Sequence, residues 1–365
     1  MEIPFLDLKA QYQTIKKEVH KKIEEVCEDS AFSDGTYVKE FENSFVKYCS
    51  AQNVIALNSG TSALHLAMIT LGIGRGDEVI LPANTFISTA WAPAYVGATP
   101  VFVDCCLDTW EIDPLKIEEK ITRKTKAIIG VHLYGQPFDI DSVKELADSH
   151  GLFLIEDAAQ AHGAKYKGER VGGFGEMACF SFYPGKNLGT YGEGGCITTN
   201  NLKYDKHLRS LRNHGSYEKY YHDEVGFNMR MGGIEGAVLH VKLKYLDQWN
   251  KKRKEIAVMY QEGISNSCIT MQKQPKYADS VYHLFVIKTK DRNGLMKYLN
   301  EHGIYPGMHY PVPCHLQKSM QKYGYKLGDY PISEELSDTI LSLPIYPELI
   351  EKQIRHIIDI VNSFN

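Results

Sequence analysis

Residues 53–72 read NVIALNSGTSALHLAMITLG, an apolar β-branched run followed by a tight turn and a helical pattern. Apolar residues recur at helical spacing after the turn: Ala63, Leu64, Ala67, Met68 and Leu71. Similar apolar runs follow, with helical patterns between several of them: DEVILP, TPVFVD, KAIIGVHLY, LFLIEDA, MACFSF and GCITT. This alternation predicts an α/β fold with a mostly parallel central sheet flanked by helices.

The pattern changes near residue 240. The stretch VKLKYLDQWNKKRKEIAVMYQEGI predicts one long amphipathic helix, and a strand pattern, a helix and a closing helix follow it. At 365 residues the chain exceeds what one core usually holds. We therefore expect a large domain of residues 1–240 and a smaller C-terminal α+β domain of residues 241–365, which begins with the long linking helix.

The composition excludes several classes of function. A net charge of -4 and the lack of a long lysine and arginine run argue against binding to nucleic acid. The N-terminus lacks the apolar core of a signal peptide, and no apolar stretch approaches the roughly 20 residues of a membrane helix. The eight cysteines form no CxxC pair, which indicates reduced thiols and no metal site. These features favour a cytoplasmic enzyme with no membrane partner.

The turn between the first strand and its helix is a candidate anion site. Gly60 and Thr61 would place free backbone N–H groups and the positive helix end at this turn, although an ordinary strand-to-helix turn has the same pattern. The glycines of LGIGRG, residues 71–76, precede a strand instead of following one. A dinucleotide-binding motif is therefore not predicted there.

A carboxylate ends the strand LFLIED. In a parallel sheet the carboxyl ends of the strands face the ligand crevice, so Asp157 could meet a cation or a protonated ring there. The alternative is that Glu156 and Asp157 merely cap the following helix. Gln160 and His162 follow closely enough to line the same crevice.

A lone lysine follows the next strand, in SFYPGKNLG, residues 181–189. Three aromatic residues precede Lys186, namely Phe180, Phe182 and Tyr183, and they predict a site that is partly shielded from water. In such a site the pKa of an amine falls and the amine becomes a nucleophile. The alternative is a solvated lysine in a surface loop. An amine, a carboxylate and a helix-end phosphate seat fit pyridoxal 5'-phosphate. Lys186 would form the Schiff base, and Asp157 would hold the pyridinium nitrogen.

Seven ordered motifs carry a resemblance to a known family: NSGTSALHLA, HLYGQPFDID, EDAAQAHGAKYKG, FSFYPGKNLGTYGEGG, LRNHGS, GFNMR and MHYPVPCH. The chain resembles the DegT/DnrJ/EryC1/StrS family of sugar aminotransferases from IPFLDLKAQY to LSLPIYP. The resemblance implies fold type I, the aspartate aminotransferase fold. It also implies a homodimer with active sites at the subunit interface.

The resemblance assigns roles to individual residues. Lys186 matches the Schiff-base lysine, and Asp157 matches the partner of the pyridine nitrogen. Gln160 matches the residue that hydrogen-bonds the cofactor hydroxyl, and Phe86 matches the aromatic ring stacked on the cofactor. The phosphate contacts are matched by Gly60, Thr61 and Ser181 from the same subunit and by Asn228 from the partner. One segment departs from the family. MGGIE, residues 231–235, replaces a pattern that often has an aspartate followed by glutamine and alanine.

The resemblance also implies the substrates. We expect L-glutamate as the amino donor and a dTDP-linked 3-keto-6-deoxyhexose as the acceptor. Amination at C-4 of a nucleotide-linked sugar stays an alternative. Tyr183, His309 and Tyr310 are candidates for the sugar pocket, while Arg212 and His214 are candidates for the pyrophosphate of the nucleotide.

Two other functions stay open. Relatives with histidine at the position of Lys186 act as sugar dehydrases, so lysine favours amine transfer. A binding or regulatory protein that keeps the fold without turnover is the second alternative.

Overall fold

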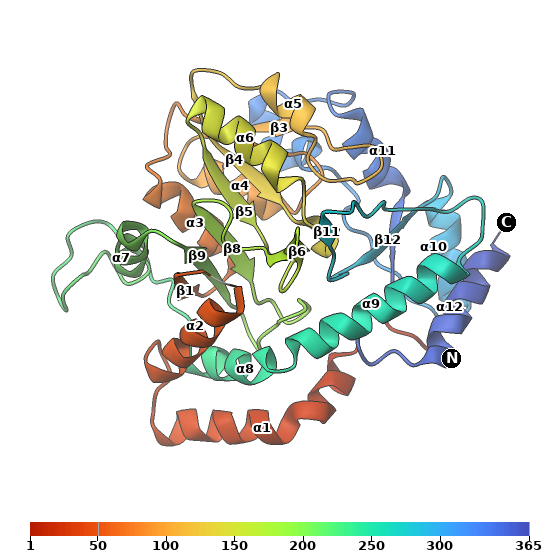
Figure 1. Cartoon of the computed structure of the whole chain (residues 1–365), viewed down its shortest axis with the longest axis horizontal. Helices are drawn as coiled ribbons and strands as arrows, with labels where there is room; N and C mark the ends of the chain where they lie inside the picture. The colour runs from red at the N-terminus through yellow and green to blue at the C-terminus, as the bar shows by residue number, and fades with distance from the viewer. Residues whose placement is uncertain (50, 365) are drawn as a thin grey trace.

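The central sheet of the computed structural model has seven strands, and the structure describes residues 1–49 and 51–364 (Figure 1). The strands are β1 (Asn53–Leu57), β2 (Glu78–Pro82), β3 (Thr99–Val103), β4 (Thr125–Val131), β5 (Phe153–Asp157), β8 (Met177–Ser181) and β9 (Gly195–Thr199), in the spatial order β1-β9-β8-β5-β4-β2-β3. Strand β9 is antiparallel to both of its neighbours, β1 and β8, and all other pairings are parallel. The predicted mostly parallel sheet is confirmed, and the carboxyl ends of β1, β5 and β8 share one edge.

Helices cover both faces of this sheet because neighbouring strand residues point to opposite sides. On one face lie α2 (Thr36–Cys49), α5 (Pro114–Glu118) and α6 (Ile140–His150), and on the other lie α3 (Gly60–Thr70), α4 (Ile87–Tyr95) and α7 (Leu202–Leu211). In β5, Leu154 packs with the first group and Ile155 with the second. Both strand faces are therefore buried, as the continuous apolar runs predict.

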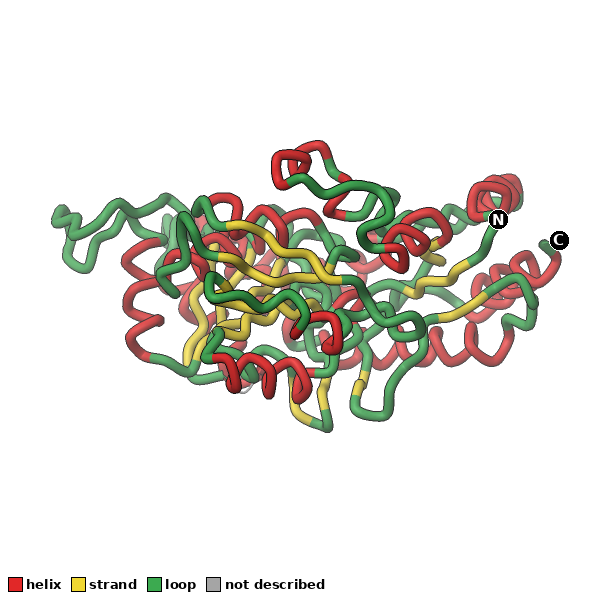
Figure 2. The backbone as a smooth tube through the Cα atoms, turned by 90° about the horizontal axis from the view of Figure 1, so that it is seen from above, coloured by secondary structure: helices red, strands yellow, loops and turns green. Residues whose placement is uncertain are grey.

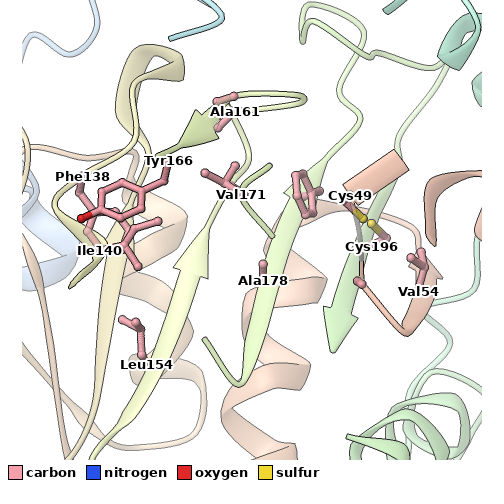
Figure 3. Packing of buried hydrophobic residues seen from close by; sticks show 14 of the residues in the cluster. Cys49, Val54, Phe138, Ile140, Leu154, Ala161, Tyr166, Val171, Ala178 and Cys196 are labelled. Carbon is pink, nitrogen blue, oxygen red and sulfur yellow. The ribbon is translucent and has the colours of Figure 1, made fainter. Parts of the chain in front are cut away.

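The core on the α2 and α6 face is tightly filled (Figure 3). Phe138 is fully buried there, and its ring occupies the space beside Gly130 of β4. A Cβ atom at Gly130 would lie 2.1 Å from the Phe138 ring, which explains a glycine within a buried strand. Cys49 and Cys196 lie in the same core as free thiols.

The segment expected to form one long linking helix, residues 241–264, is divided between two helices. Its first three residues end α8 (Gly233–Leu243), the helix breaks at Lys244 and Tyr245, and nearly all of the remainder forms α9 (Leu246–Gly263). The N–H groups of these two residues bond to carbonyls three residues back, Val241 and Lys242, so the last turn of α8 tightens and ends. Helix α9 then extends alone toward the C-terminal part (Figure 1).

A smaller sheet forms the centre of the C-terminal part. It pairs β10 (Thr270–Met271), β12 (Phe285–Lys288) and β13 (Ile340–Leu343), and it packs with α9, α10 (Arg292–Glu301) and α12 (Glu351–Ser363). The remaining elements are α11 (Pro331–Thr339), the short sheet of β11 (Ala278–Asp279), β6 (Lys165–Tyr166) and β7 (Glu169–Arg170), and the 3-10 turns η1 (Leu133–Gly135), η2 (Cys314–Leu316) and η3 (Lys318–Tyr323).

The N-terminal segment joins the two parts of the molecule. Ile3 forms a bridge with Ile304 and is buried in the core of the smaller sheet, while α1 (Leu8–Glu28) packs against α8. The two chain ends lie at the same end of the molecule (Figure 2). The expected domain limit at residues 240 and 241 falls inside α8, and the division into two domains stays a prediction.

Across residues 1–49 and 51–364, no helix has both the length and the apolar character needed to cross a membrane.

We predict that Leu154→Ala lowers the free energy of unfolding by about 2–5 kcal/mol, because it leaves a cavity in the core between β5 and the helices α2 and α6. Leu115→Ala is the matched control, since this leucine is 81% exposed and its loss should change stability by about 0.5 kcal/mol or less. Urea unfolding followed by tryptophan fluorescence measures both. Equal stabilities of the two variants would contradict the packing described for β5.

Candidate active site

A cavity of about 560 Å³ opens at the shared carboxyl edge of β1, β5 and β8. This volume suits a cofactor together with part of a substrate. Ten of the residues predicted from the sequence line it: Gly60, Thr61, Phe86, Asp157, Gln160, Ser181, Tyr183, Lys186, His309 and Tyr310. The segments that carry them lie up to 250 positions apart in the sequence, and the sheet edge and the C-terminal part of the chain bring them together.

The N-terminal end of α3 forms one wall of the cavity. Ser59 caps this helix, and its Oγ accepts a hydrogen bond from the N–H of Ser62 at 3.0 Å. The N–H groups of Gly60 and Thr61 belong to the first turn and have no acceptor within the helix. A Cβ atom at Gly60 would lie 2.7 Å from Cβ of Ser181, so glycine lets the helix end reach the end of β8. The arrangement is a seat for a phosphate group.

Asp157 ends β5 and is buried at the base of the cavity. Its Oδ2 accepts a hydrogen bond from Thr89 Oγ1 at 2.7 Å, and its Oδ1 accepts one from the N–H of Ala159 at 3.2 Å. Burial raises the pKa of this carboxyl group, while the two hydrogen bonds and the positive charge of Lys186 oppose that rise. A cationic partner would therefore stabilise the charged form of the buried Asp157 carboxylate.

Thr89 was not predicted from the sequence. It is fully buried in α4, and its hydroxyl also bonds to Thr85 Oγ1 at 2.9 Å, one helical turn earlier. The two threonines of ANTFISTA at this spacing were the available signal, but their partner Asp157 lies 68 residues away. Thr89 fixes the orientation of the carboxylate.

Lys186 lies in the loop after β8 and is only partly exposed. Its backbone N–H donates to the carbonyl of Tyr183 at 2.9 Å, which closes a tight turn and directs the chain back over the cavity. Burial lowers the pKa of its amine from 10.5 to about 8, and the negative charge of Asp157 opposes this change. A substantial share of the amine is therefore uncharged and nucleophilic near neutral pH.

Aromatic and amide groups form the opposite wall. Phe86 is 47% exposed, and its ring centroid lies 5.5 Å from that of Tyr310. Gln160 accepts a hydrogen bond from the N–H of Tyr134 at 2.6 Å, so its amide nitrogen faces the Tyr310 hydroxyl at 3.1 Å. The exposed Phe86 ring can stack on a planar ligand, and the oriented Gln160 amide can donate a hydrogen bond to it.

Two further candidates lie at the outer part of the cavity. Tyr183 is 55% exposed, which leaves its hydroxyl free to meet a ligand. His309 stacks on Phe5 at 5.3 Å, and its Nδ1 lies 2.9 Å from Ser342 Oγ. Burial, together with the charge of Lys186, lowers the pKa of His309 to about 4, so its ring is neutral near pH 7.

The structure does not bring every predicted residue to this cavity. Arg212 is buried elsewhere and donates to Glu42 Oε1 at 2.8 Å and to the carbonyl of Ala56 at 2.6 Å. His214 and Asn228 are exposed outside the cavity lining. Their proposed contacts with nucleotide or phosphate stay predictions.

His162 was expected to line the crevice, but it lies in the core. It is fully buried between the rings of Phe180 and Phe182, with centroids 5.5 Å from each. Burial lowers its pKa to about 3, with a further contribution from the charge of Lys186. Its ring is therefore a neutral packing element behind the cavity wall.

Several residues of the lining were not predicted from the sequence: Phe5, Glu193, Arg253 and His283. Arg253 belongs to the basic run KKRK, which is typical of a solvated helix face. In α9 this arginine instead turns inward, is 4% exposed and donates to the carbonyl of Ile345 at 2.7 Å. A basic run does not show which of its members points inward.

The segment MGGIE, residues 231–235, which differs from the family pattern, has a local structural role. Its last three residues begin α8, and the carbonyl of Glu235 accepts a hydrogen bond from Thr190 at 3.2 Å. The Glu235 carboxylate lies beside Gly192, where a Cβ atom would be 2.8 Å away. This segment therefore supports the loop that carries Glu193 to the cavity.

The chain is similar to known proteins along nearly its whole length. The model of the DegT/DnrJ/EryC1/StrS aminotransferase family matches residues 13–362. A pleiotropic regulatory protein of Geobacillus stearothermophilus is 42% identical over 367 residues, covering 100% of this chain and 99% of that protein. The dTDP-3-amino-3,4,6-trideoxy-alpha-D-glucose transaminase of Streptomyces venezuelae is 42% identical over 363 residues, covering 99% and 96%.

Solved structures give the same result. DesV from S. venezuelae has a TM-score of 0.97 to this chain at 42% identity, and the match covers 99% of this chain and 98% of that one. The similarity confirms both the predicted family and the predicted fold.

We predict that Thr89→Val weakens the binding of pyridoxal 5'-phosphate about tenfold. The change removes a hydrogen bond that favours the charged form of Asp157, so fewer of these carboxyl groups can pair with the pyridinium nitrogen. Thr70→Val is the matched control, because the buried Thr70 hydroxyl has no partner within residues 1–49 and 51–364. Titration by visible absorbance measures both affinities, and wild-type affinity in Thr89→Val would contradict the role assigned to Thr89.

The reaction of Lys186 with the cofactor should depend on pH. We predict that the capture rate of pyridoxal 5'-phosphate by the cofactor-free protein rises with pH and is half-maximal near pH 8, because only the uncharged amine attacks a carbonyl. Stopped-flow absorbance measures this rate. A midpoint near the ordinary lysine value of 10.5 would show that the amine is solvated.

Proposed function

Since the chain belongs to the DegT/DnrJ/EryC1/StrS aminotransferase family, we propose that it transfers an amino group from L-glutamate to C-3 of a dTDP-linked 3-keto-6-deoxyhexose. Its cofactor is pyridoxal 5'-phosphate, as in the family. The observation that carries the proposal is that Lys186, with a lowered pKa, and the buried Asp157 face one cavity beside a helix-end phosphate seat.

The residues of the cavity fit this cofactor group by group. Gly60, Thr61 and Ser181 would hold its phosphate, and Asp157 its ring nitrogen. Gln160 would donate its amide hydrogen to the ring hydroxyl, and Phe86 would stack on the ring. When bound, the cofactor withdraws electrons from the carbon that carries the transferred amine.

Lys186 has two functions in this proposal. Its amine is the nucleophile that binds the cofactor, and once free it carries a proton between substrate and cofactor carbons. A pKa of about 8 suits both, because the amine can accept and release a proton near neutral pH. Burial excludes the bulk water that would compete for that proton.

The choice of C-3 rests on similarity. The name of the S. venezuelae relative specifies a dTDP sugar with its amine at C-3, and the similarity covers almost all of both chains. The opening IPFLDLKAQY and the segment MHYPVPCHLQ also resemble the branch that acts at C-3. Amination at C-4 of a nucleotide-linked sugar stays the alternative.

Lys186 separates the proposal from its two rivals. A dehydrase of this family has histidine at that position, and a purely regulatory protein has no need for a reactive amine. The G. stearothermophilus relative is named as regulatory at the same 42% identity as the transaminase, so identity alone does not decide between these functions. The reactive amine of Lys186 in the cavity favours transfer of an amino group over both alternatives.

We also propose a homodimer in the cytoplasm. Asn228 lies exposed and outside its own cavity, as a residue that reaches a partner's cofactor would. Its backbone is fixed by a bridge to Asn213, so the side chain projects from an ordered segment. The eight free cysteines are in keeping with a reducing compartment.

Lys186→Ala should lose the visible absorbance of the bound cofactor and all transamination, because no other lysine among the described residues lines the cavity. The matched control is Lys297→Ala, whose side chain is 80% exposed on α10 and should keep both properties. Absorbance spectra and a coupled 2-oxoglutarate assay measure the effect. Turnover by Lys186→Ala at the wild-type rate would exclude the proposed mechanism.

The position of amination is tested by product analysis. With L-glutamate and either a 3-keto or a 4-keto dTDP-6-deoxyhexose, we expect NMR spectroscopy to show the new amine at C-3. Conversion of the 4-keto sugar alone would replace the C-3 proposal by its C-4 alternative.

A further inference from the structure

His283 lines the cavity wall and belongs to none of the cofactor contacts proposed above. Its backbone is held on both sides, because the N–H of Leu284 donates to the carbonyl of Tyr134 at 3.2 Å and the N–H of Val281 donates to that of Gly135 at 3.0 Å. Arg253 also donates to the carbonyl of His283 at 3.2 Å. The imidazole ring is thus placed at the lining by a rigid segment.

A chain of amides fixes which ring nitrogen of His283 carries the hydrogen. Asn250 donates from Nδ2 to the backbone carbonyl of His162 at 2.8 Å, so its Oδ1 is an acceptor. Asn187 donates from Nδ2 to this Oδ1 at 2.9 Å and to the carbonyl of Val281 at 3.1 Å. Asn187 Oδ1 therefore faces His283 Nδ1 at 3.0 Å, and Nδ1 must be the donor.

The other nitrogen, Nε2, then carries a lone pair. Burial lowers the pKa of His283 well below 6.5, and the charges of Lys186 and Arg253, with the neighbouring rings of His309 and His162, act in the same direction. Throughout the described residues Nε2 has no hydrogen-bond partner, and it is not among the polar atoms sealed from solvent. It opens onto the cavity as a neutral acceptor.

A neutral acceptor here suits a hydroxyl group. A ring whose pKa lies far below that of Lys186 does not take the proton of an ammonium group, but it accepts a hydrogen bond from a neutral donor at no cost in charge. His283 and Lys186 line the same cavity, so a sugar bound for reaction with the cofactor would lie within it beside both side chains. A sugar offers hydroxyl groups on the carbons beside it.

We propose that Nε2 of His283 accepts a hydrogen bond from a hydroxyl group of the keto sugar, on a carbon adjacent to the one that receives the amine. This inference rests on the proposed function. It makes His283 a residue that selects for hydroxylated sugars, with Asn187 and Asn250 as positioning residues that hold its tautomer.

The test compares substrates and variants of the full-length protein carrying its cofactor. His283→Phe keeps the shape but lacks the acceptor, and His283→Gln restores an oxygen near the position of Nε2. On the dTDP-3-keto-6-deoxyhexose, we expect His283→Phe to lose about tenfold in kcat/KM and His283→Gln to recover part of it. On the 2-deoxy or the 4-deoxy analogue, the difference between wild type and His283→Phe should shrink below about threefold.

Equal losses on all three sugars would overturn the proposal, because a merely structural histidine affects every substrate alike. Wild-type turnover of the parent sugar is measured first, so its absence counts against the proposed function and not against His283. Ring ¹⁵N NMR shifts of His283 give an answer without turnover. They should show the hydrogen on Nδ1 in the wild type and a mixture in Asn187→Leu, and a hydrogen on Nε2 in the wild type would contradict the proposal.

Discussion

The active site depends on one constraint: the amine of Lys186 and the carboxylate of Asp157 are both partly removed from water in the same cavity. Burial lowers the pKa of Lys186 and raises that of Asp157, and the attraction between the two groups opposes both changes. The hydrogen bonds to Asp157 further oppose the rise of its own pKa. The outcome is a reactive amine beside a carboxylate that gains from a cation. Without the burial, Lys186 would be an ordinary charged lysine.

The scaffold maintains this balance by fixing each group from several elements. Strand β5 carries Asp157, and α4 orients it through Thr89. The loop after β8 carries Lys186, and Asn187 ties that loop to Asn250 of α9. Helix α9, which leads to the C-terminal sheet, thus contacts the residue next to the reactive lysine. This amide pair connects the loop of Lys186 to the C-terminal part of the chain.

Much of the fold was predictable because its signals are local. The apolar runs of the seven strands in the central sheet are visible in the sequence, as are Asp157 at the end of one run and Lys186 shortly after the next. Parallel packing places the two residues at one edge. The roles of Phe86 and Gln160 came from the resemblance instead. Thr89, Arg253 and His283 were missed because their function depends on partners far along the chain or on which face of a helix turns inward. The break between α8 and α9 was missed because it falls at Lys244 and Tyr245, with no glycine or proline to mark it in the sequence.

The most direct test of the central claim is the visible spectrum of the wild-type protein during the two half-reactions of transamination. The account predicts a yellow protein whose absorbance band disappears when L-glutamate is added and returns when the dTDP-3-keto-6-deoxyhexose follows, because Lys186 alternates between binding the cofactor and carrying a proton. If L-glutamate left the absorbance band of the cofactor unchanged, Lys186 and Asp157 would bind the cofactor without supporting transfer of an amino group. That result would contradict the account.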